Sequence, residues 1–143
     1  MQVYEDYLSA ISTITAKKLS NLKSLTKPSK LELNVGLACL LLFSNLDTSI
    51  PLTNDKSNLA DKTWSPVVKY FSNGGKTIQH LRRLKSVLDH SKVPQNQLAL
   101  IRSYVDNPAY KPSDIQALRD VCRDLYVFMR SAYNYSMFIW QTQ

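Results

Sequence analysis

Glycine, proline and cysteine are scarce in this chain, whose 143 residues include three glycines, six prolines and two cysteines. An all-β sandwich is built from many tight turns that favour glycine and proline, so this scarcity argues against such a fold. The chain is 44% apolar and 20% charged, which provides enough apolar material for a core and excludes a disordered polymer. We therefore predict a mainly helical chain of the size of one domain.

Metal-site spacings, targeting signals and membrane spans are also missing from the sequence. Cys39 and Cys122 lie within apolar helical patterns and form no Cys-x-x-Cys or cysteine–histidine spacing, so no metal and no cofactor is predicted. We interpret them as reduced core residues, with a single disulfide as the alternative. The most apolar run, residues 35–43, is shorter than the roughly 20 residues of a membrane span. No signal peptide is recognisable, so we expect a cytoplasmic protein without membrane association.

No set of residues in the sequence forms a catalytic constellation. His80 and His90 fall in a basic helical pattern and are predicted to be exposed or half-exposed. The Gly-Gly-Lys-Thr segment at residues 74–77 lacks the upstream glycine and the strand that a phosphate-binding loop requires. The chain is therefore predicted to be non-catalytic.

Positive charge is abundant, with 18 lysines and arginines against 11 acidic residues and a net charge of +7. Such a protein favours an acidic partner, which is a nucleic acid, an anionic membrane or an acidic protein surface. The basic residues are spread over several predicted helices without the pattern of a DNA-recognition helix, which disfavours nucleic acid. They form two runs: Lys17, Lys18, Lys23, Lys27 and Lys30, and then Lys69, Lys76, Arg82, Arg83, Lys85 and Lys92.

Apolar spacing predicts five helices before the C-terminal segment. Residues 3–25 carry an apolar stripe that fits either a coiled-coil strand or a surface helix packed on a core, and Pro28 ends this pattern. Ser29 and Glu32 have the spacing of a capping box, which opens a core helix at residues 30–44. The other three are expected at residues 64–71, 76–89 and 95–105, separated by a polar surface connection at 45–62 and turns at 72–75 and 106–108.

The C-terminal segment predicts one long helix that begins near Pro112 and continues to the end of the sequence. Steps of four and three residues give it a heptad seam. A helix of this length projects beyond a small globule, so two coiled-coil strands are expected to flank a helical bundle and to pair antiparallel. The predicted boundaries are 1–25, 26–125 and 126–143. The seam consists of Leu118, Cys122, Leu125, Met129, Ala132, Ser136 and Ile139.

Several segments carry a further pattern. Residues 106–122 contain an Asp-Asn-Pro turn, a helix start and a cysteine, and residues 23–30 contain a proline-marked junction. Cys39, Trp64 and the aromatic run at 125–136 follow at compatible spacings. This ordered set, which covers nearly the whole chain, resembles the microtubule-binding domain at the stalk tip of dynein heavy chains.

The resemblance implies an all-α fold, a small helical bundle inserted between two antiparallel coiled-coil stalk helices. It implies a non-catalytic segment, because the family's ATPase ring lies elsewhere in the parent chain, and an isolated fragment that is monomeric. The partner it implies is the microtubule, the polymer of α/β-tubulin, in the cytoplasm or the axoneme. The contacts it implies are Lys27, Lys30, Lys69, Lys76 and Arg119.

The resemblance also implies that microtubule affinity is tuned when one stalk helix slides against the other. Small and polar residues leave the seam loosely packed, which permits two registers of similar energy. A proline at the junction allows the first stalk helix to move independently. The hinge and seam residues are Pro28, Leu125, Met129, Ala132 and Ser136.

The chain departs from the family pattern at the positions that contact tubulin. Glu32 stands where the family has a basic residue, and Ala117 and Asp120 stand where it has two more. Lys27 replaces the first of two junction prolines. An alternative is therefore a stalk tip or helical adaptor that binds tubulin weakly and docks another protein.

Overall fold

The computed structural model describes residues 2–90, 93–106 and 110–142. This part of the chain is helical, with one isolated bridge between Leu52 and Leu59 and no strand, which confirms the predicted all-α class. The elements are α1 (Gln2–Thr13), α2 (Ala16–Ser20), the 3-10 helix η1 (Asn21–Ser24), α3 (Lys30–Phe43), α4 (Trp64–Phe71), α5 (Gly74–His90), α6 (Gln95–Val105), α7 (Pro112–Gln116) and α8 (Asp120–Gln141).

Helix α3 is the centre of the core, as its sequence predicts. It packs against α4, α6 and α8, and eleven of its residues are buried. The predicted capping box is present, because the Ser29 side chain accepts from the Glu32 backbone at 3.1 Å and Glu32 accepts from the Ser29 backbone at 2.9 Å. The cap satisfies backbone donors that a helix N-terminus leaves open.

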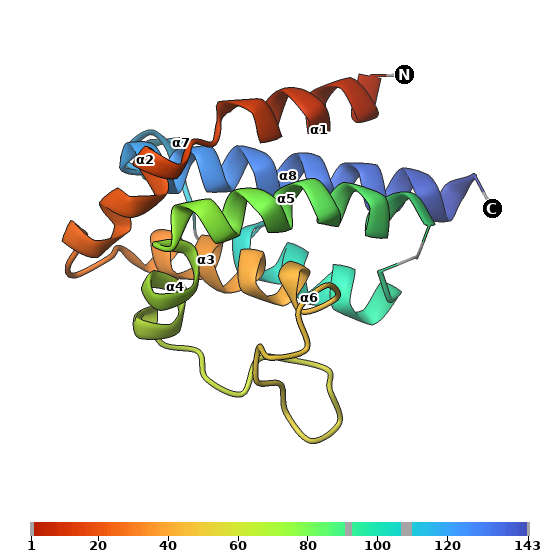
Figure 1. The fold of residues 1–143 in the computed structure, drawn as a ribbon, viewed down its shortest axis with the longest axis horizontal. Coiled ribbons are helices and arrows are strands. Elements are labelled where there is room, and N and C mark those ends of the chain that lie inside the picture. Colours follow the sequence, from red (N-terminus) through yellow and green to blue (C-terminus); the bar gives the residue numbers. More distant parts are fainter. Residues whose placement is uncertain (1, 91–92, 107–109, 143) are drawn as a thin grey trace.

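Helix α1 runs antiparallel along α8, and both chain termini lie at the same end of the molecule (Figure 1). The contact is aromatic: Tyr7 stacks on Tyr135 with ring centroids 5.4 Å apart and lies 6.2 Å from Phe128. Helix α5 joins this pair, since the Tyr135 hydroxyl donates to Asp89 and the Lys85 ammonium lies 5.2 Å from the ring of Tyr4. The antiparallel arrangement of the first and last helices is therefore present.

The single helix predicted at residues 3–25 is wrong. The chain forms α1, α2 and η1, with a break at Ile14 and Thr15. Hydroxyl side chains supply the reason, because Ser12 and Thr13 donate to carbonyls three residues earlier and Thr15 caps α2 by accepting from the Lys18 backbone. Such local hydrogen bonds compete with helix continuation.

The single helix predicted from Pro112 onward is also wrong, since α7 ends at Gln116 and α8 starts at Asp120. Nor does α8 project beyond the globule, because the Trp140 indole donates to the Val93 carbonyl at 2.7 Å. Six of the seven seam positions, from Leu118 to Ser136, are buried. Cys122 is buried beside Glu32, and the Cys39 thiol lies 3.7 Å from the Leu125 carbonyl oxygen.

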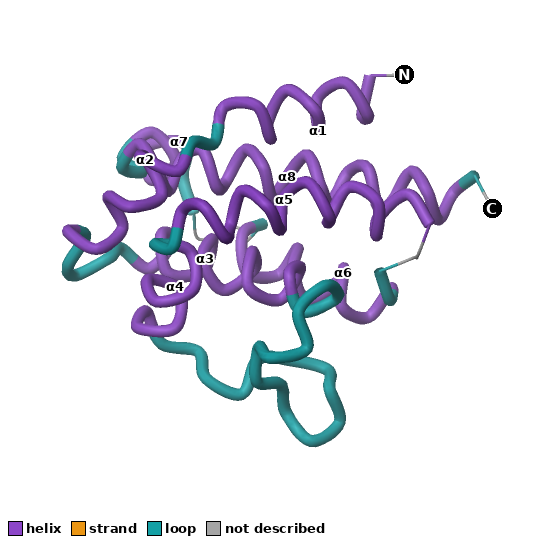
Figure 2. Tube along the Cα trace, viewed as in Figure 1, coloured by secondary structure: helices purple, strands orange, loops and turns teal. Residues whose placement is uncertain are grey.

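The middle of the chain agrees closely with prediction. Helices at 64–71 and 95–105 are confirmed, whereas α5 begins at Gly74, inside the predicted turn. The 45–62 connection lacks helix, as Figure 2 shows, but buries Ile50 and Leu59. His80 is buried rather than exposed, and the predicted turn at 106–108 extends outside the described residues, as does the side chain of His90.

The two cysteines are buried and unpaired, which confirms their place in the core. Among the residues that the structure describes, no helix combines the length and apolarity that crossing a bilayer requires.

Two adjacent glycines at the start of α5 provide a test of the packing between α2 and α5. A Cβ at Gly74 would lie 2.5 Å from the Ala16 carbonyl oxygen, whereas a Cβ at Gly75 would meet nothing within 4 Å. We expect Gly74→Ala to destabilise the protein by about 1–3 kcal/mol through overpacking. Gly75→Ala should be neutral or stabilising by up to about 1 kcal/mol. Urea unfolding followed by circular dichroism checks this, and equal midpoints for the two variants would contradict the packing.

Candidate docking surface at the distal end

The five predicted binding residues lie at the end of the molecule opposite the two termini, which we call the distal end. The connection between η1 and α3, the helix α4, the helix α7 and the first turns of α3, α5 and α8 gather there (Figures 1 and 2). Each predicted residue belongs to one of these segments: Lys27 to the connection, Lys30 to the start of α3, Lys69 to α4, Lys76 to the start of α5 and Arg119 to the N-cap of α8.

Four of these residues form an uncompensated positive surface. Lys27, Lys30, Lys69 and Lys76 are exposed, and none has an ion-pair partner within the described ranges. The same holds for Lys17 and Lys23 on the neighbouring α2 and η1, which belong to the first basic run of the sequence. Exposed like charges that lack local partners favour an acidic partner.

Arg119 differs from the four lysines because its charge is already paired. Its guanidinium donates to both carboxylate oxygens of Glu32, at 3.0 Å from Nε and 2.8 Å from Nη2. Its backbone N–H donates to the same carboxylate at 3.1 Å, and Nη1 lies 3.5 Å from the Thr26 carbonyl oxygen. The pair therefore joins the junction, the start of α3 and the start of α8.

Glu32 is not a surface charge that repels an acidic partner. Only 4% of its side chain is exposed, and its carboxylate is neutralised by Arg119. Burial acts to raise its pKa, but hydrogen bonds from the Arg119 side chain and from the Ser29 and Arg119 backbones outweigh burial and lower the pKa to about 2. The position where the resembled family has a basic contact is thus an internal ion pair here.

The two other departures are exposed. Ala117 is the C-cap of α7, and Asp120 opens α8 with a weak 3.5 Å pair to Arg123. Nearby, Lys18 binds Asp124 at 3.0 Å, which anchors α2 to α8 and removes one lysine from the free set. The distal surface therefore depends on its unpaired lysines.

The junction backbone adopts a shape that proline cannot share. Lys27 has a φ of 52°, in the left-handed region, whereas proline is restricted to a φ near −65°. A proline at residue 27 would require a different turn. The single half-buried Pro28 therefore marks a junction whose geometry differs from that of a double proline.

The seam residues lie along α8, whereas the hinge residue Pro28 lies at the junction between Lys27 and Lys30. Met129 and Ala132 are fully buried, and Ser136 is 3% exposed. The hydroxyls of Ser136 and of Tyr7 on α1 are buried and have no hydrogen-bond partner among the described residues. Sequence reasoning missed the aromatic contacts of Tyr7 with Phe128 and Tyr135, although Phe128 and Tyr135 are one heptad apart.

Comparison with known proteins finds a similarity to a dynein heavy chain-like protein. The chain is 27% identical over 108 residues to dynein heavy chain-like protein 2 of Plasmodium falciparum. The aligned region covers 75% of this chain but 2% of that protein, so the chain spans a very small part of its relative. No family model matches, and no solved structure matches.

The low pKa of Glu32 makes the fold sensitive to acid. Because the folded pKa of about 2 lies below the ordinary value of 4.5, the ionised carboxylate stabilises the fold fully above about pH 4.5. This contribution is lost as the pH falls from there through about 2. We expect the urea midpoint of the native chain to fall more steeply over this window than that of Glu32→Gln. Parallel pH profiles for the two proteins would contradict the assignment.

Removal of Arg119 should be costly because it leaves the Glu32 carboxylate buried without its cation. We expect Arg119→Ala to lower the free energy of unfolding by about 2–3 kcal/mol, less than a fully buried pair because the Arg119 side chain is 39% exposed. Arg102→Ala is the matched control, since its pair with Asp106 is exposed and contributes much less to stability. Chemical denaturation measures both, and similar losses would show that the distal pair has no special structural role.

Proposed function

We propose that this chain is the stalk-tip domain of a dynein-type motor and that it binds microtubules through the lysines of its distal end. The observation that carries the proposal is the position of Lys27, Lys30, Lys69 and Lys76 at the end opposite both termini. All four are exposed, and none has an ion-pair partner among the residues that the structure describes. The similarity to a dynein heavy chain-like protein supports the class of parent protein.

The antiparallel arrangement of α1 and α8 is consistent with a domain at the tip of a stalk. Because α1 and α8 run antiparallel, a longer chain would enter and leave the domain at one end and present the other end to a partner. In this proposal residues 1–25 and 126–143 continue into the two stalk helices, and residues 26–125 form the binding globule. The proposed globule contributes no catalytic group and takes no cofactor.

Binding would come from several weak charge contacts acting together. The microtubule surface is acidic, and each exposed ion pair contributes on the order of 0.2–1 kcal/mol. Long-range attraction would also speed the encounter. Affinity should therefore fall as salt rises, because the lysines are exposed and screened.

The interface between α1 and α8 is suited to tuning this affinity by sliding. The Tyr7 hydroxyl of α1 is buried without a partner among the described residues, which disfavours the present register. A register that supplies a partner to this hydroxyl would recover part of this energy. Arg119, at the start of α8, contacts the Thr26 carbonyl in the junction. A shift of the first helix that moves the junction would therefore change this contact at the start of α8. Pro28 would be the hinge.

A second candidate function is weak tubulin binding with docking to another protein. It is favoured by the loss of three basic contacts that the resemblance implies. Glu32 and Arg119 neutralise one another, Ala117 is uncharged, and Asp120 is acidic and exposed.

Co-sedimentation with microtubules over a salt series tests the proposal. We expect saturable binding that weakens with salt and that is reduced at least about tenfold by the triple variant Lys27→Glu, Lys30→Glu, Lys69→Glu, since several pairs are lost together. The matched control is Lys56→Glu, Arg82→Glu, Arg83→Glu, which changes net charge equally but leaves the four distal lysines in place. This control should retain most of the binding.

Two results would contradict microtubule binding by the distal end. Equal loss in both triple variants would show that only net charge matters. Absence of binding by the native chain at low salt would favour the second candidate function and a different protein partner.

A further inference from the structure

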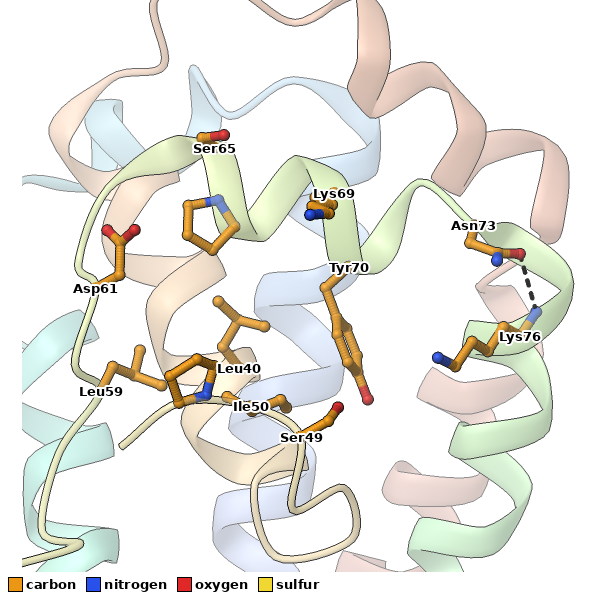
Figure 3. A pocket seen from close by; sticks show the side chains of 12 residues that line it. Leu40, Ser49, Ile50, Leu59, Asp61, Ser65, Lys69, Tyr70, Asn73 and Lys76 are labelled. Carbon is orange, nitrogen blue, oxygen red and sulfur yellow. Dashed lines mark hydrogen bonds between the residues drawn. The ribbon is translucent and has the colours of Figure 1, made fainter. Parts of the chain in front are cut away.

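A pocket of about 580 Å³ opens beside the distal surface, between α4, the start of α5 and the 45–63 connection (Figure 3). Its floor is apolar, formed by Leu40 of α3 and by Ile50 and Leu59 of the connection. These three residues are between 2% and 7% exposed, so they belong to the core and form the inner wall of the pocket. A volume of this size lies within the range of pockets that bind ligands.

The wall formed by the connection is held in place by hydrogen bonds to the helices. Asp47 accepts from the Tyr70 hydroxyl of α4 at 3.0 Å, and Asn58 accepts from the Tyr104 hydroxyl of α6 at 2.9 Å. Within the connection, the backbone of Ala60 donates to the Pro51 carbonyl at 3.1 Å. The pocket is therefore preformed, which lowers the cost of ordering on binding.

The rim carries positive charge on the side of α4 and α5. Lys69 and Lys76 both line the pocket, are exposed and have no ion-pair partner in the part of the chain that the structure describes. Asp61, the acidic residue of the lining, lies on the opposite side in Figure 3 and accepts from the backbone and hydroxyl of Thr63. The Tyr70 hydroxyl is occupied by Asp47 and His80.

We infer that this pocket binds a flexible, acidic protein segment that carries one apolar side chain. The apolar side chain would fill the space above Leu40, Ile50 and Leu59, and carboxylates beside it would pair with Lys69 and Lys76. Burial of the side chain removes apolar surface from water, while the two lysines select acidic neighbours. The lining is aliphatic on its floor and offers no aromatic pair for stacking a base, which favours a peptide over a nucleic acid.

This inference does not depend on tubulin as the partner of the distal end, and its test contains no microtubules. The probe is the synthetic peptide Gly-Glu-Glu-Leu-Glu-Glu-Gly, titrated into the native chain and followed by amide NMR shifts. We expect saturable shifts that concentrate on Leu59, Lys69 and Tyr70. Replacement of the peptide leucine by serine should weaken binding about fivefold or more, because the apolar contact is lost.

Charge reversal on the protein tests the rim. We expect Lys69→Glu, Lys76→Glu to weaken peptide binding about tenfold, since two attractions become repulsions. The control Lys56→Glu, Arg82→Glu makes the same change in net charge outside the pocket and should bind within about twofold of the native chain.

Three outcomes would overturn the inference. Equal affinity for the leucine and serine peptides would mean that only surface charge is recognised. Equal weakening in the two charge-reversed variants would exclude the rim lysines as specific contacts. Shifts with decanoate but not with the leucine peptide would identify an anionic hydrocarbon chain as the occupant instead of a protein segment.

Discussion

The ion pair between Glu32 and Arg119 is the interaction on which the distal half of the structure depends. A buried carboxylate is costly unless donors surround it, and this one receives four: two from the Arg119 side chain and one each from the Arg119 and Ser29 backbones. To supply its own N–H, Arg119 takes an extended conformation with a ψ of 154°. The helix that the sequence predicts from Pro112 therefore ends and restarts, and the start of α8 is fixed against α3.

This constraint also decides which charges the surface presents. The charge of Arg119 is neutralised by Glu32. The lysines of the junction, α4 and α5 are exposed and have no ion-pair partner among the described residues. The connection at 45–63 folds back onto α4 and α6 beside them and encloses an apolar pocket with two of these lysines at its rim. The charged surface and the apolar pocket thus share Lys69 and Lys76.

The opposite half is held by aromatic and polar contacts among α1, α5 and α8. Tyr7 packs between Phe128 and Tyr135, and Asp89 links the Tyr135 hydroxyl to the Lys85 ammonium. Burial, followed by the Asp89 charge, raises the pKa of Tyr7 and keeps its phenol neutral at all ordinary pH values. That phenol is buried without a hydrogen-bond partner among the described residues, so this interface is well packed but leaves one hydroxyl without a hydrogen bond.

The sequence by itself determined the helical class, the capping box at Ser29, the core helix α3 and the bounds of α4 and α6. These features follow from local signals, namely apolar periodicity, a hydroxyl cap and proline placement, which act over a few residues. It also indicated the lysines of the distal end and the likeness to dynein. Only the tertiary structure decided that α8 lies on the globule and that Arg119 is neutralised. Arg119 and Glu32 are 87 residues apart, and no local pattern reports a contact over that separation.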